Sequence, residues 1–145
     1  MRRSMTFAAP LFSHPVRIYW EDTDAGGLVY YANYLKFFER ARTEWLRELG
    51  FGQQRLRDEQ GLMWVVADAN VRYLQPARLD DELEVTVALS AAARATLTLT
   101  QSAQRGPTIL ADGRITLACV AAGSLRPRRI PQAILDALAS STSQT

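Results

Sequence analysis

The sequence has very little of the side-chain chemistry on which many enzymes depend: one cysteine, one histidine and one lysine among 145 residues. The single cysteine, Cys119, excludes an intramolecular disulfide. The single histidine, His14, lies beside Pro15 near the N-terminus, which argues against a zinc cluster, a Cys–His pair and a Ser–His–Asp triad. Any catalysis must therefore come from carboxylates, tyrosines, arginines or backbone amides.

Long hydrophobic runs and concentrated charge are also missing. No window approaches the ~18 consecutive apolar residues of a membrane-spanning helix. The net charge is only +2, and the arginines are scattered apart from RPRR at 126–129. This distribution argues against a nucleic-acid-binding stripe and leaves a local anion site possible. The N-terminal stretch resembles a secretory signal only weakly, because Pro10 interrupts its apolar run. We therefore expect a cytoplasmic protein with a flexible leader over residues 1–14 and a polar, flexible tail over residues 139–145.

The pattern between these ends predicts one α+β domain over residues 15–138. Apolar residues at steps of three and four predict a long helix from Asn33 to Leu49, with Asn33 as its N-cap and Gly50 at its end. The Ala-Asp-Gly segment at 111–113 is either a turn or an irregularity within one strand. The predicted strands are 16–20, 63–75, 82–90, 94–105 and 114–121, a hairpin turn is predicted at 105–107, and residues 53–61 are consistent with a short second helix.

A sheet of this kind leaves apolar surface exposed, because one long helix can cover only one of its faces. Trp64, Val66 and Tyr73 add to that surface. Exposed apolar surface of this extent is typical of an interface, so the pattern alone predicts a homodimer.

The stretch EDTDAGGLVYYANYLKFFERAR, residues 21–42, places carboxylates and two glycines directly before the long helix. Glycine lets a ligand approach the backbone, and the first N–H groups of a helix are unpaired and carry partial positive charge. A carboxylate at Asp24 beside such amides suits acyl-group hydrolysis, because the amides stabilise an oxyanion while the carboxylate activates water or attacks directly. The alternative is that Asp22 and Asp24 only cap turns. A calcium loop is disfavoured, since the twelfth position from Asp22 is Asn33 rather than glutamate.

This stretch closely resembles the YbgC/4-hydroxybenzoyl-CoA thioesterase family of hotdog-fold acyl-CoA thioesterases. Its D-x-D-x-x-G-x-V-Y-x-x-x-Y-x-x-x-x-E-x-A-R pattern is long and specific, YLQPARLDDELEV also matches, and ACVAAGSLRPRRIP matches more loosely. The resemblance covers residues 15–138 and is nearest to the branch that accompanies the Tol–Pal cell-envelope system of Gram-negative bacteria. It implies a hotdog fold, in which an antiparallel sheet wraps the long helix, residues 108–120 form one strand, and two subunits join their sheets, with dimers often pairing into tetramers.

The resemblance also implies the roles of individual residues. Asp24 falls on the catalytic carboxylate and the backbone amide of Tyr31 on the oxyanion donor, although many relatives in the Tol–Pal branch have histidine at that position. Glu39 matches the helix glutamate of the family, for which a structural pairing with a neighbouring arginine is the simpler interpretation. The remaining substrate-binding candidates are Gly26 and Gly27 in the loop, Tyr34 in the core or the acyl pocket, and Arg94, Arg128 and Arg129 as contacts for the phosphates of coenzyme A.

The sequence therefore predicts a thioesterase that hydrolyses short-chain or aromatic acyl-CoA at a subunit interface. It predicts no metal and no cofactor, because coenzyme A is part of the substrate, and no nucleic-acid partner. The alternative from another class is a non-catalytic hotdog scaffold, or an acyl-carrier-protein binding module, associated with the cell envelope. A hydratase or dehydratase is a weaker alternative, since such hotdog enzymes usually pair an acid with histidine and only His14 is available.

Overall fold

The computed structural model describes residues 12–142. The predictions made for residues 1–11 and 143–145 lie outside that range. Five strands form one antiparallel sheet in the order β1-β3-β4-β5-β2. The strands are β1 (Phe12–Arg17), β2 (Leu62–Tyr73), β3 (Glu82–Ala92), β4 (Thr96–Arg105) and β5 (Thr108–Ala121), and the helices are the 3-10 turn η1 (Trp20–Asp22), α1 (Asn33–Glu48), α2 (Gln53–Gln60) and α3 (Gln132–Thr142).

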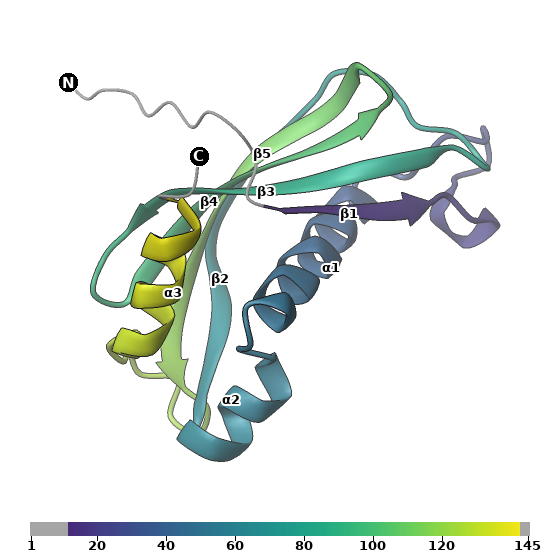
Figure 1. Ribbon diagram of the computed structural model, residues 1–145. Helices are drawn as coiled ribbons and strands as arrows, with labels where there is room; N and C mark the ends of the chain where they lie inside the picture. The colour runs from purple at the N-terminus through teal and green to yellow at the C-terminus, as the bar shows by residue number, and fades with distance from the viewer. Residues whose placement is uncertain (1–11, 143–145) are drawn as a thin grey trace.

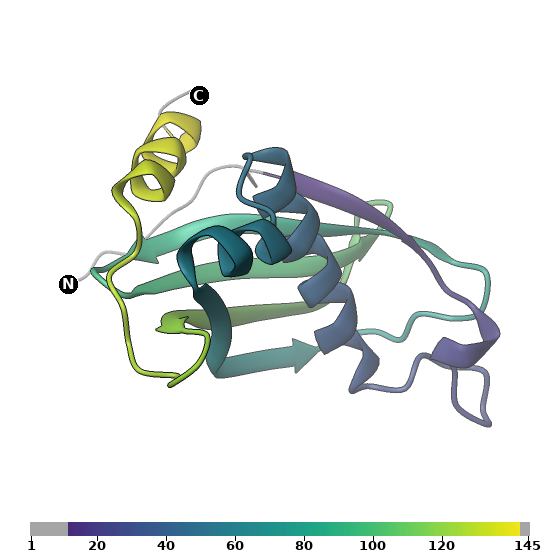
Figure 2. The same cartoon turned by 90° about the horizontal axis from the view of Figure 1, so that it is seen from below.

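The sheet curves around the long helix α1, as the predicted hotdog fold requires (Figure 1). Seen from below, α1 crosses the strands, while α3 lies at the end of the sheet remote from the loop that precedes α1 (Figure 2). Hydrophobic side chains of α1 and of the inner sheet face form a single core. No helix within residues 12–142 is long and apolar enough to cross a membrane.

The apolar stripe predicted for α1 is buried, and the helix ends before Gly50, whose φ of +95° suits glycine. Two details differ from the prediction. Ala32 rather than Asn33 is the N-cap, because the Asn33 side chain donates a hydrogen bond to the Asp22 carbonyl 2.9 Å away. The charged side chain of Arg42, which does not belong to the predicted apolar stripe, is also buried, with 7% of its surface exposed.

Strand β5 runs without interruption from Thr108 to Ala121, so the alternative of a turn at 111–113 is wrong. Gly113 instead provides room for the helix and for the neighbouring strand. A Cβ at this position would lie 3.3 Å from a ring carbon of Phe38 on α1 and 3.1 Å from the carbonyl oxygen of Asn70 on β2. The glycine therefore lets the curved sheet pack closely against α1.

Both ends of the predicted domain differ from the structure. Strand β1 begins at Phe12 instead of Val16, because residues 12–17 pair in antiparallel register with 87–82 of β3, so residues 12–14 are not part of a leader. The chain leaves the strand after Arg17 and turns at η1. At the other end, α3 was not predicted, and it takes in residues 139–142 of the predicted tail. This helix forms because Ile134 and Leu138, four positions apart, bury one face against the core.

Candidate active site

The loop before α1 is shaped by Asp22, which is 6% exposed. Its Oδ2 atom accepts a hydrogen bond from the Tyr19 amide at 2.8 Å. Its backbone carbonyl accepts two more, from the Tyr30 amide at 3.0 Å and from the Asn33 side chain. The Oδ2 atom and the backbone carbonyl of Asp22 therefore serve the loop conformation.

Asp24 lies two residues further along and is exposed. Its Oδ1 atom accepts hydrogen bonds from the amides of Gly26, at 2.9 Å, and Leu28, at 3.2 Å. The Gly27 amide donates to the Asp24 carbonyl at 3.0 Å, and the φ of +80° at Gly27 requires glycine. Oδ2 accepts no hydrogen bond from the chain between residues 12 and 142, so one oxygen holds the turn while the other is available to a ligand.

Two amides immediately before the first turn of α1 are unpaired within the described residues. No side chain caps Ala32. The amides of Asn33, Tyr34 and Leu35 donate to the carbonyls three residues before them. The amides of Tyr31 and Ala32 donate to no acceptor in the described part of the chain. Together with the positive end of the helix dipole, these two N–H groups can stabilise a developing negative charge.

Asp24 and Tyr31 both line a pocket of about 400 Å³. Aromatic rings form much of its wall, since the Tyr73 ring lies edge-on to Tyr31 at 5.8 Å and tilted to Tyr34 at 5.5 Å. Tyr34, predicted in the core or in the acyl pocket, is 3% exposed and also lines this pocket, whose use for an acyl group stays a prediction. Its hydroxyl oxygen accepts a hydrogen bond from the Ala77 amide at 3.1 Å. Burial raises the pKa of Tyr34, so the phenol stays neutral.

The turn at residues 76–81 supports this pocket from the other side. The Val29 amide donates to the Ala77 carbonyl at 2.9 Å, which ties the Asp24 loop to the turn. Asp81 fixes the turn, because its Oδ2 accepts from the Arg78 amide at 2.9 Å and from the Arg105 guanidinium at 2.7 Å. Partial burial opposes ionisation of Asp81, but these two donors outweigh it and lower the pKa of the carboxyl group.

The three predicted phosphate-binding arginines are exposed and lie close to one another but far from Asp24. The Ile130 amide, next to Arg129, donates to the Arg94 carbonyl at 2.8 Å. Arg94 follows the far end of β3, whereas the Asp24 loop is tied to the turn before β3. The eleven residues of β3 span roughly 35 Å at about 3.3 Å each. Within one chain the structure therefore groups Arg94, Arg128 and Arg129 but does not bring them to the pocket.

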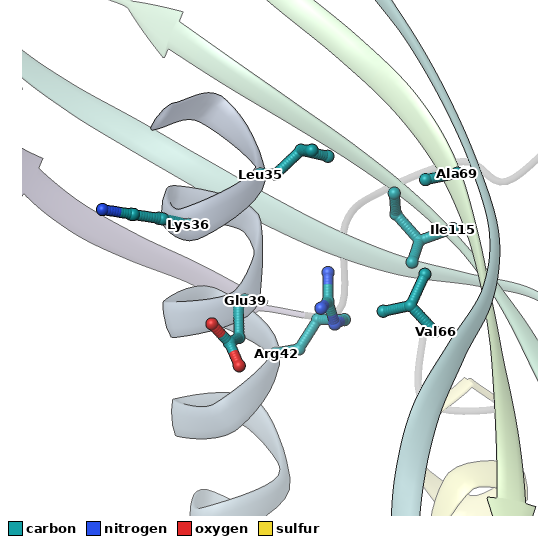
Figure 3. Close-up of a pocket in the computed structure, with 7 residues that line it drawn as sticks. All are labelled: Leu35, Lys36, Glu39, Arg42, Val66, Ala69 and Ile115. Carbon is teal, nitrogen blue, oxygen red and sulfur yellow. The ribbon is translucent and has the colours of Figure 1, made fainter. Parts of the chain in front are cut away.

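A second pocket of about 300 Å³ lies between α1 and β2 (Figure 3). It contains Arg42, which the sequence analysis did not select. The guanidinium points across the pocket toward Val66 and Ile115. Glu39, predicted to pair with a neighbouring arginine, forms no salt bridge within residues 12–142, although its carboxylate favours the charged form of Arg42, whose pKa burial lowers. A sequence signal for Arg42 did exist, because it lies four residues after Phe38 and thus beside the apolar stripe.

Comparison with known proteins agrees with this architecture. The sequence profile of the thioesterase-like superfamily matches residues 18–138. The acyl-CoA thioesterase YbgC of Haemophilus influenzae is 46% identical over 123 residues, which cover 85% of this chain and 90% of the relative. The acyl-CoA thioester hydrolase YbgC of Escherichia coli O6:H1 is 43% identical over 126 residues, which cover 86% and 93%.

Solved structures give the same result. The probable thioesterase from Bartonella henselae superposes with a TM-score of 0.78 at 32% identity, covering 82% of this chain and 98% of that one. A 1,4-dihydroxy-2-naphthoyl-CoA thioesterase from Synechocystis superposes with a TM-score of 0.81, covering 88% and 95%, and at 21% identity it supports the fold alone. The chain therefore belongs to the thioesterase-like superfamily and, within it, to the YbgC family of acyl-CoA thioesterases.

Proposed function

We propose that this protein hydrolyses the thioester bond of short-chain or aromatic acyl-CoA at the pocket between the Asp24 loop and the start of α1. The observation that carries the proposal is that Asp24 and Tyr31, which both line this pocket, each have an unsatisfied group. The Oδ2 atom of Asp24 accepts no hydrogen bond, and the Tyr31 and Ala32 amides donate none, within residues 12–142. A thioester carbonyl placed there would meet both a base and an oxyanion site.

The residues can perform the reaction in two ways. Asp24 can remove a proton from a water molecule that attacks the thioester carbon, or its carboxylate can attack that carbon to give a mixed anhydride that water then hydrolyses. In either route the carbonyl oxygen becomes an oxyanion, and the free amides of Tyr31 and Ala32 stabilise it. The carbon–sulfur bond then breaks, the coenzyme A thiolate leaves and takes up a proton, and the products are the free acid and coenzyme A.

The side chain of Tyr31 is not required for this oxyanion site, because the donor is its backbone amide. Histidine or tyrosine at this position therefore preserves the electrostatic part of catalysis. The ring of Tyr31 instead belongs to the aromatic wall with Tyr30 and Tyr73. We infer that residue 31 influences which acyl groups fit rather than whether hydrolysis occurs.

We further propose that the working form contains at least two copies, as a dimer or a dimer of dimers. Strand β2 pairs with β5 on one side and is at the edge of the sheet on the other. An unpaired edge of twelve residues is long enough to pair with a second copy. A second copy is also the only way for Arg94, Arg128 and Arg129 to reach the phosphates of a bound coenzyme A, given their distance from Asp24 in one chain.

The proposed reaction needs no metal or separate cofactor, because the coenzyme is part of the substrate, and we place it in the cytoplasm, where acyl-CoA is found. The test is release of coenzyme A thiol by the purified protein over a panel of aliphatic and aromatic acyl-CoA thioesters. We expect turnover of at least one class. Turnover of none, together with tight binding of acyl carrier protein, would favour the non-catalytic binding module instead.

A further inference from the structure

The guanidinium of Arg42 is buried, and the carboxylate of Glu39, which lines the same pocket, acts on it through space without forming a salt bridge within residues 12–142. Its Nη1 donates to the side-chain oxygen of Gln101 at 3.0 Å. Gln101 is completely buried, and its own nitrogen donates to the carbonyls of Phe38, at 3.1 Å, and Thr86, at 3.3 Å. These two bonds fix the amide of Gln101 so that its oxygen faces Arg42. Arg42 forms no salt bridge with any residue between 12 and 142.

The other nitrogens of Arg42 face the second pocket. Among the residues described, Trp64 alone has a fully buried side-chain polar atom without a partner. The Arg42 nitrogens that do not contact Gln101 are therefore reachable from the pocket, although the residue as a whole is 7% exposed. Leu35, Val66, Ala69 and Ile115 make most of the wall apolar, the carboxylate of Glu39 also lines it, and Lys36 extends away from it (Figure 3). A charged donor in an apolar pocket favours a ligand oxygen strongly, because little water competes for it.

The second pocket follows the first along the same two elements. On α1 the order is Tyr34, Leu35, Arg42, and on β2, which runs in the opposite direction, it is Tyr73, Ala69, Val66. Arg42 follows Tyr31 by eleven residues, which is roughly 16 Å along a helix axis at 1.5 Å per residue. Arginine side chains on a helix lean toward its N-terminus, which shortens the gap between the guanidinium and the oxyanion site.

We propose that Arg42 binds the end of the acyl group remote from the thioester, and that the substrate carries an acceptor oxygen there. This inference rests on the proposed thioesterase function and adds the substrate class. Arg42 touches the substrate away from the reacting bond and therefore determines specificity. A carboxylate matches the charge and the fork of the guanidinium best, and a phenol or hydroxyl group offers the same acceptor chemistry without the charge.

The test compares thioesters that differ only in the remote oxygen. Adipyl-CoA is paired with hexanoyl-CoA, suberyl-CoA with octanoyl-CoA, and 4-hydroxybenzoyl-CoA with benzoyl-CoA. We expect the wild-type protein to favour the oxygen-bearing member of at least one pair by about tenfold or more in kcat/KM, as a charge-assisted hydrogen bond would give. The pair that shows the preference identifies the carboxylate or the phenol as the group bound.

Two variants assign the preference to Arg42. Arg42→Met removes the donor at similar length and should bring the ratio within the pair close to one, whereas Arg42→Lys, which keeps the charge, should retain part of it. The matched control is Arg47→Met, because Arg47 is an exposed arginine on the same helix that pairs with Glu44, and it should leave the ratio unchanged. The wild-type comparison remains informative even where Arg42→Met fails to fold.

Two results would overturn the inference. One is hydrolysis of plain acyl-CoA thioesters by the wild-type protein with no preference within any pair. The other is a preference that survives in folded Arg42→Met. Either would indicate that Arg42 has another partner, such as a carboxylate from a second copy, while the proposed hydrolysis stands. Hydrolysis of no thioester at all would instead refute the proposed function itself.

Discussion

Replacing Asp24 with asparagine separates the turn-capping role that the structure shows for this residue from the catalytic role that we propose. The Oδ1 atom holds the loop by accepting hydrogen bonds from the Gly26 and Leu28 amides, and the asparagine side-chain oxygen can accept the same two bonds. The free Oδ2 atom becomes an NH₂ group, which can neither accept a proton nor attack a carbonyl. Asp24→Asn therefore keeps the turn and removes the proposed chemistry, whereas Asp24→Ala removes both.

The expected sizes of the two effects are well separated. Loss of a general base lowers turnover by roughly 10²–10⁴-fold, which is about 2.7–5.4 kcal/mol of transition-state stabilisation. Loss of the exposed turn hydrogen bonds in Asp24→Ala costs only about 0.5–1.5 kcal/mol each, since water can replace them. We expect both variants to lose activity to a similar extent, and only Asp24→Ala to unfold at a measurably lower temperature.

The assay is colorimetric detection of released coenzyme A thiol, with thermal unfolding followed by circular dichroism. Asp58→Asn is the matched control, because Asp58 is an exposed aspartate on α2 whose side chain contacts only Gln54. If Asp24 merely caps the turn, Asp24→Asn will retain turnover within about threefold of wild type while Asp24→Ala loses it. That outcome would refute the catalytic assignment.

Three further predictions concern stability and reactivity. The pKa of Asp81 is lowered in the folded state, so the stability that its carboxylate contributes is present above the unfolded pKa near 3.9 and is lost as the pH falls through the folded value. Asp81→Asn should lower the free energy of unfolding at pH 7 by roughly 1 kcal/mol and make that free energy depend less on acid pH. Urea titrations at pH 7 and pH 4 that are unchanged by the substitution would contradict this. Gly113→Ala should destabilise the protein by about 1–3 kcal/mol in the same titration, because the new methyl group meets the Asn70 carbonyl and the Phe38 ring, and no change in midpoint would show that the sheet can yield. Cys119 is fully buried, and burial raises the pKa of its thiol. The thiol should therefore react with a thiol reagent at pH 8 only after unfolding. Rapid labelling of the native protein would contradict the buried position of Cys119.

The sequence was sufficient for the parts of the fold that depend on periodicity. The stripe on α1 and the alternation of Leu97 and Leu99 with threonines on β4 place residues on buried and exposed faces as found. Boundaries failed where partners decide them: Phe12 is in a strand because it lies opposite Val87 of β3, a contact that no local pattern contains. Gly113 illustrates the same limit, since glycine within an alternating stretch is compatible with a turn until the packing of Phe38 is known.

For the candidate site, too, some residues could be predicted from the sequence and others could not. The motif identified Asp24 and the N-terminal end of α1, because residues close in sequence determine how the Asp24 loop lies against the start of the helix. It could not decide between capping and catalysis, and the structure is compatible with both, because one oxygen of the carboxylate holds the turn while the other accepts no hydrogen bond within residues 12–142. Arg42 was missed because its hydrogen-bond partner, Gln101, is fifty-nine residues away, and an arginine near an apolar stripe is ordinarily solvated.

One chain contains the proposed reacting centre but only part of the proposed site for a whole acyl-CoA molecule. The groups proposed to act on the thioester and on the far end of the acyl group follow one another along α1, so a single α1–β2 unit can hold the acyl part. The arginines proposed for the phosphates lie at the opposite end of β3, beyond the reach of a ligand bound in the same chain. If those arginines bind the phosphates, they bind the substrate of a neighbouring copy. Neutralising Arg94 should then raise KM without lowering kcat, because phosphate contacts are equally strong in the bound substrate and in the transition state.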